Sequence, residues 1–253
     1  MNIQLLAEKI DTAAKNAQAV AQLTHSTPFD VDTAYAIQKA SLERRYERGE
    51  SFIGVKMGFT SKAKMEQMGV HDLIWGRLTN KMQLEQNGEL PFSEFIHPRA
   101  EPEICFRVKR QIDRAITMEE VKDYIDGVAA AIEVIDSRYQ NFKFSLEDVI
   151  ADNCSSAALV IGDWHSVDTA LDNLKMELIV DGETVQSGSS AAILSNPWES
   201  VIAAARLGEK YGQVLPVGSV IMAGAATSAV YLKAGQAVST SVEHLGNASF
   251  TVA

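Results

Sequence analysis

Two glutamates flank a proline at the start of an alternating apolar run, in Glu101-Pro102-Glu103. On a β-strand, side chains two residues apart point to the same face, so we expect these carboxylates to lie side by side. Neighbouring carboxylates repel each other, which raises a pKa or calls for a cation between them. Pro102 is compatible with a strand that begins here or lies at a sheet edge. The motif therefore indicates acid–base or metal-binding chemistry.

A third carboxylate, Glu133, interrupts the apolar run 129–135. An unpaired charge is very unfavourable to bury in such a run. We therefore expect Glu101, Glu103 and Glu133 to meet around one hard divalent cation, which takes oxygen ligands and keeps positions open for water or substrate. The alternative is that Glu101 and Glu103 are solvated on an open face and that Glu133 pairs with a lysine or arginine.

Lys56 lies in the apolar segment 52–58, with Gly54 and Gly58 two residues away on either side. A buried lysine needs an anion or a lowered pKa. Glycines in a strand let a ligand approach the backbone closely. Lys56 is therefore a candidate for binding an anionic group. The alternative is a lysine at a strand end whose ammonium group reaches solvent.

Several catalytic classes lack their motifs in this chain. The sequence contains no G-x-S-x-G, no H-x-x-x-H, no Walker loop and no G-x-G-x-x-G, so serine hydrolase, zincin, nucleotide and dinucleotide functions are unsupported. The five histidines show no ligand spacing. Cys105 and Cys154 are too few for a disulfide framework, and we expect reduced, buried thiols.

The 253-residue chain is 46% hydrophobic with a formal net charge of −10, which allows one large core and argues against nucleic acid as the main partner. No apolar run approaches the roughly 20 residues of a membrane span. The N-terminus lacks the basic region and apolar stretch of a signal peptide. We predict a cytoplasmic protein that acts on a small molecule and binds neither nucleic acid nor a membrane.

Apolar spacing of three and four residues predicts a helix over 3–20, and a second helix from about 32 to Gly49. After residue 52, short apolar runs separated by Gly, Pro and Asn predict strands. Further expected elements are a half-buried strand at 103–108, a short helix from Thr117 to near Gly127, a strand at 128–135, a hairpin at Asp181-Gly182, a helix from 196 towards Gly212, and strands at 219–223, 237–242 and 248–252. The expected fold class is α+β: a helical N-terminal segment, 1–50, precedes a β-rich catalytic domain, 51–253.

Four motifs in this order resemble those of the fumarylacetoacetate hydrolase superfamily: 54–61, 97–104, 133–138 and 151–153. The closer resemblance is to its branch of 2-keto-4-pentenoate hydratases and 4-oxalocrotonate (2-oxo-3-hexenedioate) decarboxylases, from meta-cleavage degradation of aromatics. It extends from about residue 30 to the C-terminus. Three stretches, 62–70, 96–98 and 137–144, resemble the decarboxylases more than the hydratases.

The resemblance implies a fumarylacetoacetate-hydrolase-like core, with Mg²⁺ or Mn²⁺ on the residues matching Glu101, Glu103 and Glu133. It implies a catalytic, substrate-contacting lysine at Lys56. It also implies substrate contacts near Leu78, Asp152, Asn153 and Ser156, to which we add Asn80 and Arg138. Family members commonly form homo-oligomers, and the decarboxylases associate with the hydratase that takes their product.

The predicted reaction is loss of CO₂ from the far end of 2-oxo-3-hexenedioate. A Lewis acid at the 1-carboxylate and 2-oxo oxygen stabilises the resulting dienolate, and an apolar pocket around the departing carboxylate favours its loss. The nearest alternative is a 2-hydroxypenta-2,4-dienoate hydratase, although many hydratases carry aspartate where this chain has Asn80. Hydrolysis of an acylpyruvate, which needs a water-activating His–Glu pair, and a non-catalytic metal- or anion-binding protein are the others.

Overall fold

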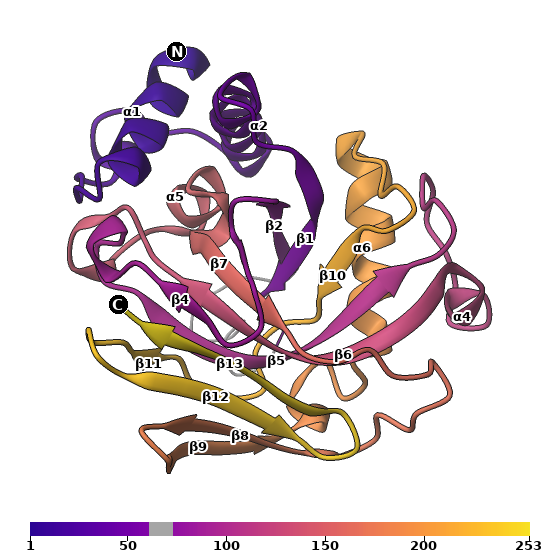
Figure 1. The fold of residues 1–253 in the computed structure, drawn as a ribbon. Helices are drawn as coiled ribbons and strands as arrows, with labels where there is room; N and C mark the ends of the chain where they lie inside the picture. The colour runs from indigo at the N-terminus through magenta and orange to yellow at the C-terminus, as the bar shows by residue number, and fades with distance from the viewer. Residues whose placement is uncertain (61–72) are drawn as a thin grey trace.

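The computed structural model describes residues 1–60 and 73–253 (Figure 1). The first sheet runs in the order β2 (Ile74–Thr79), β1 (Phe52–Gly58), β10 (Val220–Met222), β5 (Arg99–Val108), β6 (Ile125–Ile135), β7 (Ser156–Ile161) and β3 (Gln83–Leu84), and β11 (Val230–Tyr231) also pairs with β5. The second runs β4 (Gly88–Leu90), β13 (Gly246–Val252), β12 (Ala237–Val242), β8 (Lys175–Val180) and β9 (Glu183–Ser189). The mixed sheets confirm the α+β class.

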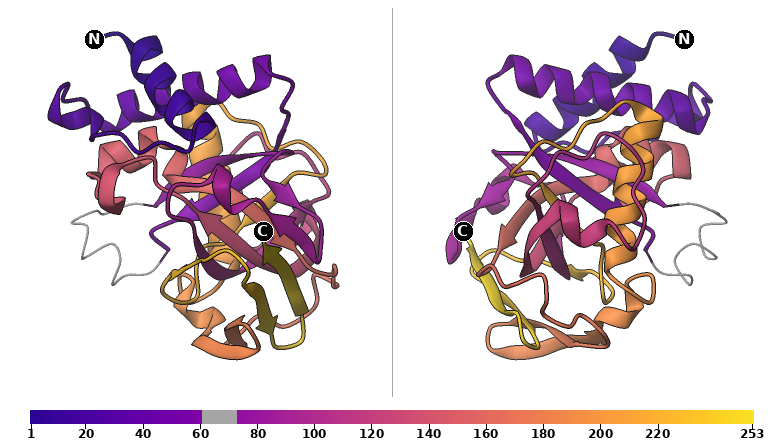
Figure 2. Two further views of the ribbon diagram at one scale, coloured as in Figure 1. Left: turned by 60° about the vertical axis from the view of Figure 1, so that its left-hand side comes forward. Right: turned by 90° about the vertical axis from the view of Figure 1, so that its right-hand side faces the viewer.

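The helices are α1 (Ile3–Lys15), α2 (Val31–Glu47), α4 (Val121–Tyr124), α5 (Leu146–Ala151) and α6 (Trp198–Tyr211). Short 3₁₀ turns are η1 (Leu23–His25), η2 (Phe92–Glu94), η3 (Gln140–Phe142), η4 (Asn153–Ser155) and η5 (Ser190–Ala192). Figure 2 shows α1 and α2 together at one end of the molecule and the second sheet at the other. No helix of the described residues is long and apolar enough to cross a membrane.

Both α2 and α6 agree with their predicted positions, whereas α1 ends at Lys15, five residues before the predicted end at Val20, which forms a β-bridge with Tyr139. Asp30 caps α2 by accepting a hydrogen bond from the Thr33 N–H at 2.9 Å. At the other end of the chain, α6 is followed by Gly212 with φ of 65°, a left-handed conformation that glycine adopts without strain. These ends are set by local sequence, which is why periodicity and capping residues located them.

The predicted helix from Thr117 to near Gly127 is wrong in its extent. Only the single turn α4 is helical, and β6 begins at Ile125. The Thr117 N–H donates to the Glu120 carboxylate at 3.0 Å, so the expected cap closes a turn and does not start a long helix. Pairing of Ile125 with Val108 on β5 explains the early strand, because the ladder extends β6 beyond its apolar run.

Pro102 lies inside a strand, and not at a strand start or sheet edge as predicted. It sits opposite Ile132 of β6, while its carbonyl accepts from the Ala226 N–H at 3.1 Å on the other side. On that side β10 pairs with residues 105–107 and β11 with 99–100, so Pro102 falls in the gap between them. The missing N–H therefore interrupts no ladder. The strand is also buried on both faces, and not half-buried as expected.

Alternation along β6 separates the core from the site. Ile132 and Val134 pack with β12 and β13 of the second sheet in one apolar cluster. Glu133 lies between them in sequence and therefore points to the opposite face. A larger cluster fills the space between the first sheet and the helices, and it includes Ile10 of α1 and Ile37 of α2. The N-terminal helices thus share their core with the strands, and the division at residue 50 stays a prediction.

Shortening Ile37 to alanine is expected to destabilise the whole chain. Ile37 is fully buried, so Ile37→Ala leaves a cavity and lowers the free energy of unfolding by about 2–5 kcal/mol. The three tryptophans all lie after residue 50, so their fluorescence reports the β-rich part. Fluorescence and far-UV circular dichroism should give one coincident urea transition, shifted in the variant. Val217→Ala, at an exposed site, should change stability by less than about 0.5 kcal/mol. Two separate transitions would contradict a shared core.

Candidate active site

The register of β5 against β6 brings the three predicted carboxylates together. Glu101 lies directly opposite Glu133, and Glu103 follows two residues along β5 on the same face. Side-chain oxygens of the three residues lie within 4.8 Å of one another, and the side chains are buried. Like charges opposite each other destabilise a strand pair, so this arrangement needs a compensating cation. The expectation that these carboxylates meet is confirmed.

The raised pKa values of two of the glutamates, and their oxygens without donors, indicate that the cluster lacks positive charge. Burial raises the pKa of Glu103 well above its usual range, and the adjacent Glu133 raises it further. Burial also raises the pKa of Glu133 to about 7, against the opposing effect of Lys56. One oxygen of Glu103 accepts the Gly224 N–H at 2.8 Å. The other, Oε1, and Oε1 of Glu133 are buried without a hydrogen-bond donor among residues 1–60 and 73–253.

These features fit a hard divalent cation. Three clustered carboxylates, of which Glu103 and Glu133 have oxygens without a donor, are the ligand type that Mg²⁺ and Mn²⁺ prefer. A bound cation would reverse the raised pKa values, because its charge favours the ionised carboxylates. Together with Lys56, the three ionised carboxylates leave two negative charges, which one divalent ion neutralises. Glu101, Glu103 and Glu133 are therefore the residues that would hold the metal.

Lys56 completes the cluster from the neighbouring part of the sheet. It is 5% exposed, and its Nζ lies 2.9 Å from Glu133 Oε2 and 3.1 Å from the Cys154 carbonyl oxygen. Burial alone would lower the pKa of Lys56, but Glu133 together with Cys154, Glu103 and Glu101 outweighs burial, and the net pKa is raised. The ammonium group is therefore charged and buried. The alternatives of a solvent-reaching lysine and of solvated glutamates on β5 are excluded by this burial, while the pairing of Glu133 with a lysine is present.

A left-handed turn fixes the carbonyl that orients Lys56. Asn153, Cys154 and Ser155 all have positive φ, between 51° and 60°, which is rare for residues other than glycine. Asn153 anchors the turn to β2 through two 2.8 Å hydrogen bonds, one from the Arg77 N–H and one to the Arg77 carbonyl. A side chain at Gly76 would clash with the Asn153 carbonyl, so glycine permits this close approach. The strained turn is thus held in place from β2.

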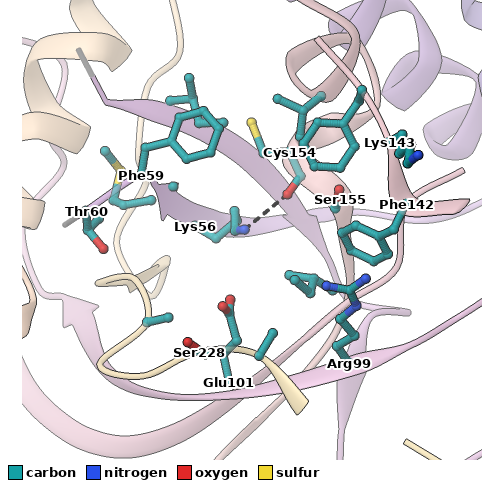
Figure 3. Close-up of a pocket in the computed structure, with 18 residues that line it drawn as sticks. Lys56, Phe59, Thr60, Arg99, Glu101, Phe142, Lys143, Cys154, Ser155 and Ser228 are labelled. Atoms are coloured by element: carbon teal, nitrogen blue, oxygen red, sulfur yellow. Dashed lines mark hydrogen bonds between the residues drawn. The ribbon is translucent and has the colours of Figure 1, made fainter. Parts of the chain in front are cut away.

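The cluster opens into a cavity of about 480 Å³. Figure 3 shows Lys56 and Glu101 on one side of it and Arg99, Phe142 and Lys143 on the other. Further apolar side chains line the space between, among them Phe59, Ile74, Phe144 and Val149. The cavity therefore has a charged end, an apolar middle and a second, cationic wall. The predicted apolar pocket is present, but it is not exclusively apolar.

The other predicted substrate contacts do not line this cavity. Arg138 and Asp152 form a buried ion pair, in which Arg138 also donates to the Ser156 carbonyl at 3.2 Å. Leu78 is packed in an apolar cluster, and Asn80 is exposed, where its side chain accepts from the Ser51 N–H at 2.8 Å. The roles placed on Leu78, Asn80, Arg138, Asp152, Asn153 and Ser156 stay predictions, and their contacts here are with the protein. The decarboxylase-like stretch 62–70 lies outside the described residues.

The sequence analysis did not identify Arg99 or Phe142 as cavity residues. Arg99 stands two residues before Glu101, so the alternation that paired Glu101 with Glu103 places it on the same face. Phe142 carried no comparable signal, because its position depends on the η3 turn. Both cysteines are buried and unpaired as expected, and burial raises the pKa of the Cys154 thiol to about 12.

Three comparisons relate this chain to known proteins. Residues 86–253 match the family model of the fumarylacetoacetate (FAA) hydrolase C-terminal domain. A 4-oxalocrotonate decarboxylase of a Pseudomonas species is 47% identical over 99% of this chain and 98% of its own. A 2-hydroxyhexa-2,4-dienoate hydratase of Comamonas testosteroni is 32% identical over 98% and 96%. The solved structure of 4-oxalocrotonate decarboxylase from Pseudomonas putida G7, complexed with magnesium and adipate, has a TM-score of 0.95 at 35% identity and covers 99% and 97% of the two chains.

Binding of Mg²⁺ is expected to depend on the carboxylate cluster. Mg²⁺ should raise the Tm of the wild-type protein, because it binds the folded state and relieves repulsion there. Glu103→Gln should weaken Mg²⁺ binding at least about tenfold in a calorimetric titration. Without metal and at alkaline pH, Glu103→Gln should melt above the wild type, since it removes a buried carboxyl whose raised pKa makes its ionisation unfavourable.

Glu183→Gln is the matched control, because Glu183 is exposed on β9, away from the cluster. It should leave both the affinity for Mg²⁺ and the metal-free Tm unchanged. Wild-type affinity in Glu103→Gln would contradict the assignment of the cluster as the metal site.

Proposed function

The chain belongs to the fumarylacetoacetate hydrolase family, and from this premise we propose that it is a divalent-metal-dependent decarboxylase of 2-oxo-3-hexenedioate (4-oxalocrotonate). The observation that carries the proposal is a buried three-carboxylate cluster paired with Lys56, in a chain 47% identical over nearly its full length to a 4-oxalocrotonate decarboxylase. The products are CO₂ and 2-hydroxypenta-2,4-dienoate or its keto tautomer, 2-oxopent-4-enoate.

The reaction breaks the bond between C5 and C6 of the substrate. The bonding electron pair moves into the conjugated system and becomes negative charge on the 2-oxo oxygen, while C6 leaves as CO₂. A proton then adds to oxygen or carbon to give the neutral enol or ketone. The chemical demand on the protein is therefore to stabilise negative charge at the 2-oxo end.

The charged end of the cavity suits this demand. A divalent ion on Glu101, Glu103 and Glu133 would supply Lewis-acid stabilisation of charge on the 2-oxo group. Lys56 has three N–H donors, of which the Glu133 carboxylate and the Cys154 carbonyl engage two. Its third donor is available to the oxo-acid end of the substrate. Because Lys56 is already oriented by these two contacts, it needs no rearrangement as charge develops.

The middle of the cavity holds the conjugated chain of the substrate. Phe59, Phe144 and Val149 present apolar surface there, which excludes water from the C5–C6 bond. Exclusion of water strengthens the electrostatic contacts at the charged end. It also keeps bulk water away from the dienolate that forms as CO₂ leaves.

The cavity lining bears on two alternative activities, a hydratase and an acylpyruvate hydrolase. A hydratase acting on 2-hydroxypenta-2,4-dienoate remains the second candidate, because hydratases of this family are 32% identical over nearly the whole chain. Asn80, where many hydratases carry aspartate, does not count against a hydratase, because Asn80 lies outside the cavity. For acylpyruvate hydrolysis, no histidine of the described residues lines the cavity.

We propose three further properties of this protein, each of which rests on its family. They are homo-oligomerisation, association with the hydratase that consumes its product, and a cytoplasmic location. The metal is Mg²⁺ or Mn²⁺. Light scattering of the purified protein, alone and mixed with a hydratase of the pathway, tests the first two.

The function is tested by supplying each substrate in turn to the purified protein. With Mg²⁺ or Mn²⁺ and 2-oxo-3-hexenedioate, we expect substrate absorbance to fall with equimolar release of CO₂. Chelation of the metal should abolish the reaction. Consumption of 2-hydroxypenta-2,4-dienoate without any CO₂ release from the dioate would make the protein a hydratase.

Replacing Lys56 by methionine should lower kcat by about 10²–10³-fold, the usual effect of losing one donor to developing charge. The protein should still fold, because methionine fills a similar volume. Steady-state kinetics with saturating metal measures the effect. Lys175→Met, at an exposed position on β8, is the control and should match the wild type. A Lys56→Met enzyme with unchanged kcat would contradict the assigned role.

A further inference from the structure

Arg99 forms a second cationic position in the cavity, opposite the carboxylate cluster. Its guanidinium carbon lies 3.7 Å from the ring centre of Phe142 and 4.0 Å from that of Tyr231. Tyr231 is its cross-strand neighbour on β11, and the Tyr231 hydroxyl accepts a hydrogen bond from the guanidinium. Aromatic faces thus hold the cation and shield it from water. The guanidinium is fixed at the cavity wall.

No described part of the chain places a carboxylate against Arg99 to neutralise its charge. Among residues 1–60 and 73–253, no carboxylate forms an ion pair with Arg99, and its buried Nε has no hydrogen-bond acceptor. Arg107 is paired with Asp126 and Arg138 with Asp152. Arg77 of β2 has no carboxylate partner among the described residues, but its guanidinium donates to the side-chain oxygens of Gln38 and Gln213. A half-buried, unpaired guanidinium is unfavourable unless an anion is bound beside it. The arrangement is therefore suited to an anionic ligand group.

The charged end of the cavity does not serve a second anionic group. A divalent ion and Lys56 would balance the three carboxylates there, and Lys56 is the one lysine or arginine that the described residues place at that end of the cavity. Arg99 supplies a cationic partner for a second anionic group on the opposite wall. Lys143 is also at the cavity, but it is exposed, so water and salt screen its charge.

The two positions start from neighbouring residues of one strand face, so a small dicarboxylate is the size of ligand that could reach both. Arg99 and Glu101 point to one face of β5 and are separated by one strand repeat, roughly 6.6 Å. Three bonds of an extended chain span roughly 3.8 Å, so the five bonds from C1 to C6 of a hexanedioate span roughly 6 Å. A dioate lying along β5, with its first carboxylate at the metal end, brings its last carboxylate to Arg99.

We propose that Arg99 binds the distal carboxylate of the substrate and selects dicarboxylates over monocarboxylates. The identity of the substrate rests on the proposed function, but the selection of dicarboxylates is a separate property of the cavity. Phe142 and Tyr231 both lie against the guanidinium, and the Tyr231 hydroxyl accepts from one of its N–H groups, so the carboxylate meets the remaining N–H groups. Arg99 is a binding and positioning residue, since the distal carboxylate is the group that departs.

Arg99 is expected to affect substrate binding more than the rate of the chemical step. The distal carboxylate carries its full charge in the bound substrate and loses it as neutral CO₂ forms. The contact with Arg99 is therefore stronger in the ground state than in the transition state, so it lowers KM without raising kcat. The monocarboxylate product has no group for Arg99, which favours its release over that of the substrate.

The direct test compares two six-carbon acids that differ by one carboxylate. Adipate and hexanoate are titrated calorimetrically into the Mg²⁺-loaded wild type, Arg99→Met and Arg107→Met. We expect the wild type to prefer adipate at least about tenfold. Arg99→Met should lose this preference through weaker adipate binding, with hexanoate unchanged. Arg107→Met is the matched control, because Arg107 also stacks on an aromatic ring from β5 but lies outside the cavity.

Kinetics provide a second readout that a merely structural role would not give. For 2-oxo-3-hexenedioate, Arg99→Met should raise KM by about 10–100-fold with kcat within about threefold of the wild type. Unchanged adipate affinity in Arg99→Met, or equal loss of adipate and hexanoate, would overturn the proposal. Arg99-dependent binding of adipate in a protein that releases no CO₂ would leave the subsite standing and refute the proposed function alone.

Discussion

Repulsion among three buried carboxylates is the constraint around which this protein is built. Glu101 and Glu133 lie opposite each other in adjacent central strands, and Glu103 stands two residues further on. The long β5–β6 ladder holds them at this distance, because a shift by one residue would turn one of the glutamates to the other face. Lys56 offsets one of these charges by pairing with Glu133. The fold thus stores an electrostatic cost that a divalent ion and its ligands relieve.

Much of the surrounding structure serves to keep that cluster in place. The second sheet packs on Ile132 and Val134, which commits the intervening Glu133 to the opposite side of β6. Asn153 ties the left-handed turn to β2, and that turn presents the carbonyl that orients Lys56. The ion pair between Arg138 and Asp152 fixes the residue that directly precedes this turn. Asn153, Arg138 and Asp152 therefore position Lys56 through the backbone of the turn. They can matter for catalysis without contacting the substrate.

The sequence predicted those parts of the site that depend on local geometry. Strand alternation is a local property, so Glu101 and Glu103 could be placed on one face. Glu133 was joined to them because an unpaired charge in an apolar run is unfavourable to bury. The role of Lys56 followed from one charged residue in an apolar run. Arg99 obeys the same alternation but was missed, because its setting depends on Tyr231 and Phe142, which are distant in sequence. The early start of β6 was missed for the same reason, since pairing with Val108 extends it.

Negative charge on the substrate changes in opposite directions at the two ends of the cavity during the proposed reaction. At the cluster, negative charge grows during the proposed reaction, and groups already fixed there gain in strength as it grows. At Arg99, negative charge disappears, so a strong contact there would hold back the chemistry. The rings of Phe142 and Tyr231 attract the guanidinium and partly balance its positive charge, while its other N–H groups stay available to the ligand. A partly balanced guanidinium can orient the departing carboxylate without binding it so tightly that CO₂ loss is suppressed.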